Sequence, residues 1–381
     1  MAAGDAHHSA TRPPSGLVRR LPRRPPSLEV HDSLDGLRDE WDALADATGA
    51  SPFVRPGWIE PWLRAFGSGT VRTLAVRREG RLAGVLPLQT RAGTISSPAN
   101  WQTPLFGPVA ESSDVAAELA VGLLSGVKRR ADLWFLGLEN LGYAESSATA
   151  AEAGFGLIVR TIARSPYVAV EGSFDEYMAG LNRKFRKDIG RRWRRLEDQG
   201  RVEVVYEDGS ERLEELLTDG FRLEGSGWKA EIGTAIASDP VRERFYREVA
   251  RWAAGRGWLR LAFLRLDDRA IAFDFCIETG GVSYVLKGGF DVEARNLGPG
   301  VLLTHHELER AFELGLTSYE LLGQQDDYKR SWTSTVRERE RLQAFPPSML
   351  GTAEYMAWRY GRPLARRARA GLSGRRSSRS P

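Results

Sequence analysis

The stretch RNLGPGVLL, residues 295–303, has a composition suited to binding an anion. It lies between a run that predicts a strand and a run that predicts a helix beginning at Val301. Gly298 and Gly300 allow positive φ and let the backbone approach a ligand closely. The first turn of a helix presents unpaired N–H groups and a positive dipole end, which together suit a phosphate. The spacing therefore predicts a phosphate cradle, although Pro299 removes one donor and a plain strand-to-helix turn would use the same glycines.

A carboxylate in the preceding strand is the first candidate for a general base. Alternation along RAIAFDFCIE places Asp274, Cys276 and Glu278 on one face and apolar side chains on the other. Asp274 lies mid-strand among apolar neighbours, where desolvation is expected to raise the pKa of its carboxyl toward a range useful for a base. A carboxylate satisfied by a neighbouring hydrogen bond is the alternative interpretation. Glu224 and Asp327 are further candidates for the base, and each also fits a surface or capping group.

The remaining nucleophile and metal-ligand types give weaker signals. Cys276 has no His near it in the sequence, and a buried strand cysteine is usually inert. His305 and His306 are adjacent on a predicted helix and so face different directions, which excludes them as a metal pair. His305, near the predicted cradle, is a candidate cofactor contact, with a packed or exposed histidine as the alternative. The sequence predicts no metal.

These candidates need elements that hold them in place. Residues 257–291 predict three antiparallel strands that turn at 267–268 and at 280–281. The loop follows, then a helix over 301–315 and a strand over 317–323. Earlier in this half, residues 173–200 and 210–229 each predict a helix.

The first half of the chain shows the same order of elements. Residues 32–48 predict a helix capped by Asp32 or Ser33. A hairpin turning at Glu79-Gly80, a helix over 113–130 and a strand over 131–138 follow. We therefore expect two lobes of similar architecture.

The charge distribution limits the classes of partner. The chain has a pI near 9.2 and a net charge of +4. Residues 1–27 carry +4 and residues 351–381 carry +7, which leaves about −7 for residues 28–350. The body of the protein is therefore acidic, which argues against extended nucleic-acid binding. The single cysteine excludes an internal disulfide.

The two ends of the chain are predicted to be basic tails. Residues 1–27 are expected to be disordered, and residues 346–381 to be partly helical and partly disordered. The segment 351–370 fits either a basic amphipathic helix that contacts anionic lipid or a synthase complex, or a solvated tail. No run approaches the roughly 18 apolar residues of a membrane span, and the N-terminus does not resemble a secretory signal, so we expect a cytoplasmic protein.

The order of strands, Arg-x-x-Gly-x-Gly, helix and strand resembles the GNAT acyltransferase superfamily, whose loop of this type binds the pyrophosphate of acyl-coenzyme A. Arg295, Gly298 and Gly300 match its defined positions. EGSGWKAEIGT, GGFDVEARNLGPGVLL and DDYKRSW are similar to the GNAT branch associated with cellulose or exopolysaccharide biosynthesis. That branch is related to the Fem-type peptidoglycan aminoacyltransferases, which have two GNAT-like lobes. The resemblance covers roughly residues 30–345 and is most specific over 174–332.

The resemblance implies an α+β fold of tandem GNAT-like lobes, each a mostly antiparallel mixed sheet flanked by helices. Residues 28–160 would form the first lobe and residues 161–345 the catalytic lobe. The implied reaction is direct attack on the thioester of acetyl-CoA or another acyl-CoA. The acceptor would be a small molecule or glycan precursor: an amino sugar, a polysaccharide precursor or a related cell-envelope metabolite.

The resemblance also implies roles for individual residues. Tyr328 and Lys329 would act with Asp274 in catalysis, with Tyr328 as the acid near the place where the GNAT sheet splays open. The coenzyme A cradle would comprise Arg295, Asn296, Leu297, Gly298, Gly300 and Val301. The acceptor cleft would comprise Glu224, Trp228, Lys229 and Trp332.

A basic cluster at residues 182–195 supports two rival hypotheses. Phe185, Ile189 and Trp193 recur at four-residue spacing, so one stripe of a helix packs while its arginines face outward. With an aminoacyl-tRNA donor, as in the Fem-type relatives, those arginines would contact RNA phosphates. In a scaffold of a polysaccharide-synthesis complex they would bind an acidic partner. The acidic body and the intact 295–300 loop favour a coenzyme A enzyme over both.

Overall fold

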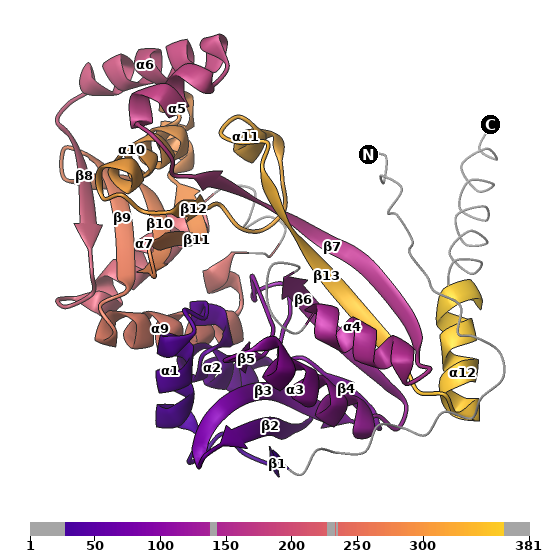
Figure 1. Ribbon diagram of the computed structural model, residues 1–381. Helices are drawn as coiled ribbons and strands as arrows, with labels where there is room; N and C mark the ends of the chain where they lie inside the picture. Colours follow the sequence, from indigo (N-terminus) through magenta and orange to yellow (C-terminus); the bar gives the residue numbers. More distant parts are fainter. Residues whose placement is uncertain (1–26, 138–142, 227–232, 234, 362–381) are drawn as a thin grey trace, which may run out of the picture. The chain divides into compact units, whose positions relative to one another are not determined.

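The computed structural model describes residues 27–137, 143–226, 233 and 235–361. Within it the chain forms two compact units (Figure 1). Unit 1 comprises residues 1–50, 68–162 and 339–381, and unit 2 comprises residues 51–67 and 163–338. The strands β7 (Gly156–Ala169) and β13 (Val336–Phe345) both continue from one unit into the other.

Unit 1 contains a mixed sheet in the order β1-β2-β3-β4-β6-β13, with β5 paired to β3. β2 and β3 form an antiparallel hairpin, whereas β4 and β6 run parallel. The chain reaches β6 from β4 through α3, whose first turn is capped by the Ser112 hydroxyl. The elements are β1 (Leu28–His31), α1 (Arg38–Ala47), β2 (Thr70–Arg78), β3 (Arg81–Arg91), β4 (Thr94–Ser96), β5 (Val109–Ala110), α3 (Ser113–Ser125), β6 (Arg130–Gly137), α4 (Tyr143–Glu152), α12 (Met349–Met356) and the π-helical turn η4 (Ala357–Gly361).

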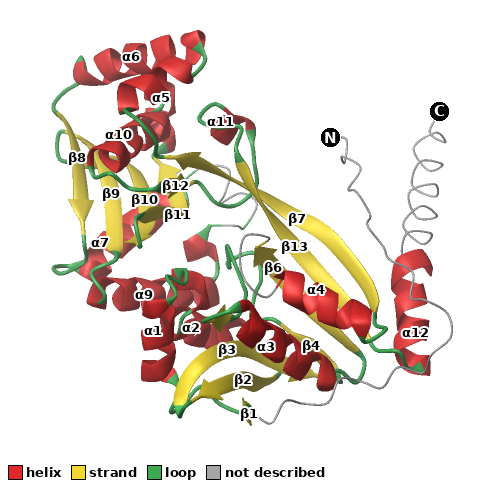
Figure 2. Ribbon diagram, viewed as in Figure 1, coloured by secondary structure: helices red, strands yellow, loops and turns green. Residues whose placement is uncertain are grey.

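Unit 2 contains a second mixed sheet, in the order β7-β12-β11-β10-β9-β8 (Figure 2). β8 to β11 are antiparallel, and β11 and β12 are parallel partners joined through α10. The elements are η1 (Pro52–Val54), α2 (Pro56–Phe66), α5 (Phe174–Gly180), α6 (Arg183–Glu197), β8 (Val202–Glu207), α7 (Leu213–Glu224), η2 (Ile236–Ser238), α9 (Pro240–Gly255), β9 (Leu259–Leu266), β10 (Arg269–Thr279), β11 (Val282–Phe290), η3 (Val292–Leu297), α10 (Pro299–Glu313), β12 (Ser318–Glu320) and α11 (Asp327–Arg330).

Both units therefore contain an antiparallel hairpin and a parallel strand pair joined through a helix. This confirms the mixed α+β class and the repeated order of elements. The turns at 79–80, 267–268 and 280–281 are confirmed as well, because each lies between the strands that the sequence predicts there. Glu79 and Gly80 both adopt positive φ, as the two central residues of a type I′ turn do, whereas in the 267–268 turn Asp267 adopts positive φ and Asp268 does not.

Other local predictions were wrong. The first helix begins after Leu37, which makes no side-chain cap, and the Ser33 hydroxyl instead accepts the Asp35 N–H within a preceding turn. The helix predicted over 173–200 is two helices, since the Asn182 side chain accepts backbone N–H groups of the next turn and starts a new helix. The helix predicted from Val301 begins two residues earlier, at Pro299.

The units are not continuous along the chain, unlike the predicted division at 160/161. Residues 51–67 lie in unit 2, because their aromatic side chains pack there: Trp58 meets Phe245 edge-on at 5.2 Å between ring centroids. Phe53 meets Tyr284 in the same way at 5.1 Å. Residues 339–345 of β13 pair with β6 and so lie in unit 1.

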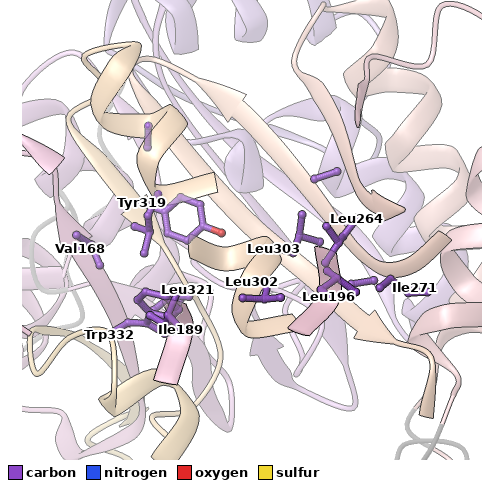
Figure 3. Packing of buried hydrophobic residues seen from close by; sticks show 14 residues of the cluster. Val168, Ile189, Leu196, Leu264, Ile271, Leu302, Leu303, Tyr319, Leu321 and Trp332 are labelled. Atoms are coloured by element: carbon purple, nitrogen blue, oxygen red, sulfur yellow. The ribbon is translucent and has the colours of Figure 1, made fainter. Parts of the chain in front are cut away.

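The core on one face of the unit 2 sheet fixes the position of α10. Leu302 and Leu303 of α10 are buried, and α6 contributes Ile189 and Leu196 to the same cluster. Figure 3 shows Ile189 beside Trp332. On the opposite face, Phe273 packs on α7, where a Cβ on Gly220 would lie 2.3 Å from the ring. The sheet is thus held between α10 with α5 and α6, and α7 with α9 and α2.

We predict that Gly289→Ala destabilises the protein by about 2 kcal/mol, because the added Cβ would lie 2.3 Å from the Glu224 Cα of α7 and backbone must shift to admit it. The free energy of unfolding from urea denaturation measures this. Gly255→Ala is the matched control, since its Cβ meets nothing within 4 Å and lies at a helix end. A Gly289→Ala variant as stable as the control would contradict this account of the packing.

Candidate active site

The loop between β11 and α10 has the geometry of an anion-binding turn. Gly298 adopts φ +69° and forms the N-cap of α10, and its carbonyl accepts the Val301 N–H at 3.0 Å. Its own N–H donates to the Arg295 carbonyl at 3.0 Å. The first turn of α10 carries no acidic residue. Among the described residues the Gly300 N–H has no acceptor, so the helix start has a donor to offer a ligand.

Arg192 of α6 is a functional candidate that the sequence analysis missed. A Cβ on Gly298 would lie 1.9 Å from its Nη1 atom, so the glycine leaves room for the guanidinium. The Arg192 Nε donates to Asp188 at 2.6 Å, which holds the side chain in place. Arg295 is exposed, and within the part of the chain that the structure describes its side chain makes no hydrogen bond or ion pair. The loop is therefore bordered by two cations from segments about a hundred residues apart.

The two parallel strands beside this loop separate. β12 pairs with β11 along Val282–Tyr284 and ends at Glu320. β11 continues to Phe290, where it still pairs with β10. The sheet therefore opens at the end of β11 that leads into the 295–300 loop, where an extended ligand can lie between strand edges.

One side of α10 joins the candidate acid to the helix start. Gly300, Thr304 and Glu307 recur at helical spacing and face one side. The Tyr328 hydroxyl donates to the Gly300 carbonyl at 3.2 Å and lies 2.6 Å from the Thr304 hydroxyl. Tyr328 is 38% exposed as a residue, but the surroundings of its hydroxyl are desolvated. This desolvation, followed by the charge of Asp274, raises the pKa of the hydroxyl, so the group stays protonated. Tyr328 therefore lies at the cradle with a proton to give.

Asp274 contacts the same side of α10 one turn farther along. Its carboxyl hydrogen-bonds with that of Glu307, and burial raises the pKa of Glu307. The Tyr319 hydroxyl donates to the Glu307 carboxyl at 2.8 Å, and the Cys276 thiol does so at 3.3 Å. When two buried carboxyl groups are in contact, their mutual repulsion favours the state with one of them protonated over the state with both ionised. The raised pKa of Glu307 therefore favours a protonated Glu307 carboxyl beside Asp274.

The absence of a side chain at Gly288 leaves room for the Asp274 carboxyl against the sheet. The two residues are register partners on β11 and β10, and a Cβ on Gly288 would lie 1.8 Å from the Asp274 Oδ1. The predicted alternation of this strand is confirmed, since Cys276 and Glu278 also contact α10, through Glu307 and Arg310 respectively. Cys276 is buried, and desolvation raises the pKa of its thiol, which fits a packed group and not a nucleophile.

Lys329 lies next to the site and faces elsewhere, whereas the Trp332 side chain reaches the Tyr328 hydroxyl and acts to lower its pKa. The Lys329 Nζ donates to the Leu322 carbonyl at 2.6 Å, so it ties α11 to the end of the preceding strand. The Trp332 ring is buried in the core of unit 2 and meets Phe185 edge-on at 4.9 Å. Its carbonyl accepts the Tyr177 hydroxyl at 2.9 Å. In this structure both residues hold the α11 segment in place.

The other predicted site residues are dispersed. Glu224 is buried at the end of α7, and its carboxylate accepts the Ile236 N–H at 2.7 Å. Asp327 is exposed and ion-pairs within its own short helix. Trp228 and Lys229 lie outside the described residues.

A cationic groove of about 1740 Å³ lies along α5, α6 and the residues after α11. Its two carboxylates are both engaged: Glu176 accepts the Ser173 N–H and hydroxyl, and Asp188 binds Arg191 and Arg192. α6 supplies most of the cations, at a spacing that places them along one side of the helix. The cationic lining residues are Arg183, Lys184, Lys187, Arg191, Arg194 and Arg330.

Residues 183–330 match the family model described as an acetyltransferase (GNAT) domain. The matched segment runs from the start of α6 to the end of α11, and so contains the 295–300 loop, Asp274, Tyr328 and Arg192. This part of the chain is a GNAT-type acyltransferase domain. No curated protein sequence matches the chain.

Solved structures share the fold at low sequence identity. FemX has a TM-score of 0.55 and 14% identity, covering 82% of this chain and 96% of its own. The C-terminal domain of a candidate lysylphosphatidylglycerol synthetase from Agrobacterium fabrum has a TM-score of 0.52 and 14% identity, covering 84% and 95%. A conserved protein of unknown function from Bacteroides thetaiotaomicron has a TM-score of 0.52 and 12% identity, covering 83% and 99%. These similarities support the tandem GNAT-like architecture.

His305 gives a prediction about pH. Its ring packs edge-on against Phe174 at 5.2 Å and near Trp193 at 6.4 Å, and burial lowers its pKa to about 4. The folded state therefore binds fewer protons than the unfolded state between pH 6.5 and 4, so stability falls as the pH drops through that window. We expect His305→Gln to reduce that loss, measured by urea denaturation across the window. An identical loss in both proteins would contradict a buried neutral imidazole.

Proposed function

We propose that the protein transfers an acyl group from acyl-CoA, with acetyl-CoA as the first donor to test, to an amine or hydroxyl. The observation that carries this proposal is the Gly298–Gly300 turn at the start of α10, where Arg192 and Arg295 add positive charge. A helix N-terminus with an available N–H and two cations suits the pyrophosphate of coenzyme A. The parted strands beside it suit the extended pantetheine arm.

In this proposal Asp274 and Tyr328 perform the two proton transfers. Asp274 accepts the proton of the acceptor amine or hydroxyl as that group attacks the thioester carbonyl. The C–S bond breaks, and Tyr328 gives its proton to the departing thiolate. Glu307 hydrogen-bonds with the Asp274 carboxyl and so holds it in position. The raised pKa keeps the proton on the Tyr328 hydroxyl at neutral pH until the thiolate departs, and the hydroxyl then regains a proton from solvent.

The acceptor in this proposal is an amino sugar, a polysaccharide precursor or a related cell-envelope metabolite. The similarity of residues 224–234, 288–303 and 326–332 to the exopolysaccharide-associated branch supports it. FemX and the candidate lysylphosphatidylglycerol synthetase share the fold. We place the reaction in the cytoplasm, where acyl-CoA is available.

We predict that acetyl-CoA and coenzyme A bind the purified protein with micromolar affinity, and that Gly300→Glu abolishes this binding. The added carboxylate would fill the helix start and repel phosphate. Isothermal titration calorimetry measures both. Gly255→Glu is the matched control, since it adds the same charge at an open position of α9 and should bind like the wild type.

A second candidate is a transferase that uses aminoacyl-tRNA. The cationic groove favours it, because five of its six cations are spaced along one side of α6 in a way that suits successive phosphates. Isothermal titration calorimetry with bulk transfer RNA in place of coenzyme A distinguishes the two candidate functions. No binding of coenzyme A by the folded wild type, together with salt-sensitive binding of RNA, would replace the acyl-CoA proposal with this one.

We predict that Asp274→Asn lowers turnover at least about 100-fold, because an amide cannot accept the proton of the attacking amine or hydroxyl. Coenzyme A affinity should stay unchanged, because residue 274 does not contact the 295–300 loop. The assay is release of free coenzyme A during acceptor screening. Asp327→Asn is the matched control for the alternative base, since that side chain is 98% exposed on α11. Unchanged turnover of Asp274→Asn would remove Asp274 from the mechanism.

A further inference from the structure

The last helix of unit 1 is anchored through one face. Trp358 of η4 is buried against Ile158 and Phe345, with Tyr355 packed beside them. Glu354 adds ion pairs to Arg129, at 2.8 Å, and to Arg130. The side of α12 and η4 that carries these residues packs on unit 1, and the opposite side is their outer face.

That outer face is apolar. Met349 is 94% exposed, Leu350 60%, Met356 51% and Tyr360 54%. Met349, Met356 and Tyr360 recur at helical spacing, so they lie along one side of the helix. Between Pro347 and Tyr360, the exposed residues include no charged side chain. Large apolar side chains in such a row on a protein surface usually mark an interaction site.

The sequence after this face supplies strong positive charge. Residues 362–381 contain seven arginines and no aspartate or glutamate. They contain two leucines as their large apolar residues, too few to cover the outer face of α12. A second copy of the chain would bring an equal positive tail against the first, which opposes self-association. An anionic surface with an apolar interior complements both the apolar row and the tail.

We propose that the outer face of α12 and η4, with the arginine-rich tail, binds the surface of an anionic lipid bilayer. Met349, Leu350, Met356 and Tyr360 enter the interface between headgroups and acyl chains, and the arginines bind headgroup phosphates. Arginines near an anionic bilayer are attracted to its headgroups, so seven of them with a shallow apolar insertion give reversible binding. No helix among the described residues is long and apolar enough to span a membrane. This proposal is independent of acyl transfer.

Cosedimentation of the full-length protein with vesicles tests the proposal. We expect binding to phosphatidylcholine vesicles containing 30% phosphatidylglycerol, weaker binding as salt increases, and little binding to pure phosphatidylcholine. The double substitution Met349→Ser and Met356→Ser should weaken binding at least about tenfold, since it removes two inserting side chains. Replacing the seven tail arginines by glutamine should do the same.

Leu314→Ser is the matched control, because Leu314 is another large exposed apolar residue, 53% accessible, and belongs to unit 2. It should bind vesicles like the wild type. Equal binding to neutral and anionic vesicles, no binding by the wild type, or unchanged binding by the serine variant would each overturn the proposal. A dimer of the wild type that the serine substitutions dissociate would also overturn it and assign the face to a second copy.

Discussion

The candidate site depends on one side of one helix. Gly300 ends the 295–300 loop and its carbonyl accepts the Tyr328 hydroxyl, Thr304 contacts the same hydroxyl, and Glu307 contacts the Asp274 carboxyl. Because a helix is rigid over two turns, α10 sets the spacing of the proposed cradle, acid and base, although Tyr328 and Asp274 come from other elements. The leucines of α10, buried against β9 and β10, hold this helix to the sheet.

Small residues make that arrangement possible where backbone and side chains approach closely. Gly298 leaves room for Arg192, Gly288 leaves room for the Asp274 carboxylate, and Gly289 lies against the backbone of α7. Each glycine faces a different group, so the pattern LKGGF…GPG encodes three separate packing constraints. Of these three glycines, Gly298 could be given a role from the sequence, because the residues around it form a recognisable loop motif.

Features that depend on adjacent residues could be predicted from the sequence, whereas contacts between residues far apart in the sequence could not. The hairpin turns, the alternation around Asp274 and the loop before α10 each depend on a few adjacent residues. Arg192 was missed because no spacing rule links α6 to a loop a hundred residues later. Trp332 and Glu224 were predicted in the acceptor cleft from the family resemblance, yet Trp332 packs in the core and Glu224 accepts a backbone N–H. A resemblance in sequence does not by itself distinguish a binding group from a buried one.

The central claim is that the start of α10 receives the phosphates of acyl-CoA. Hydrogen–deuterium exchange of the full-length protein, with and without saturating acetyl-CoA, tests it most directly because amide N–H groups are the proposed contacts. The account predicts slower exchange in bound protein at Gly300, Val301 and Leu302, with smaller changes along β11. Unchanged exchange at these amides under conditions where acetyl-CoA is bound, with protection elsewhere, would contradict it.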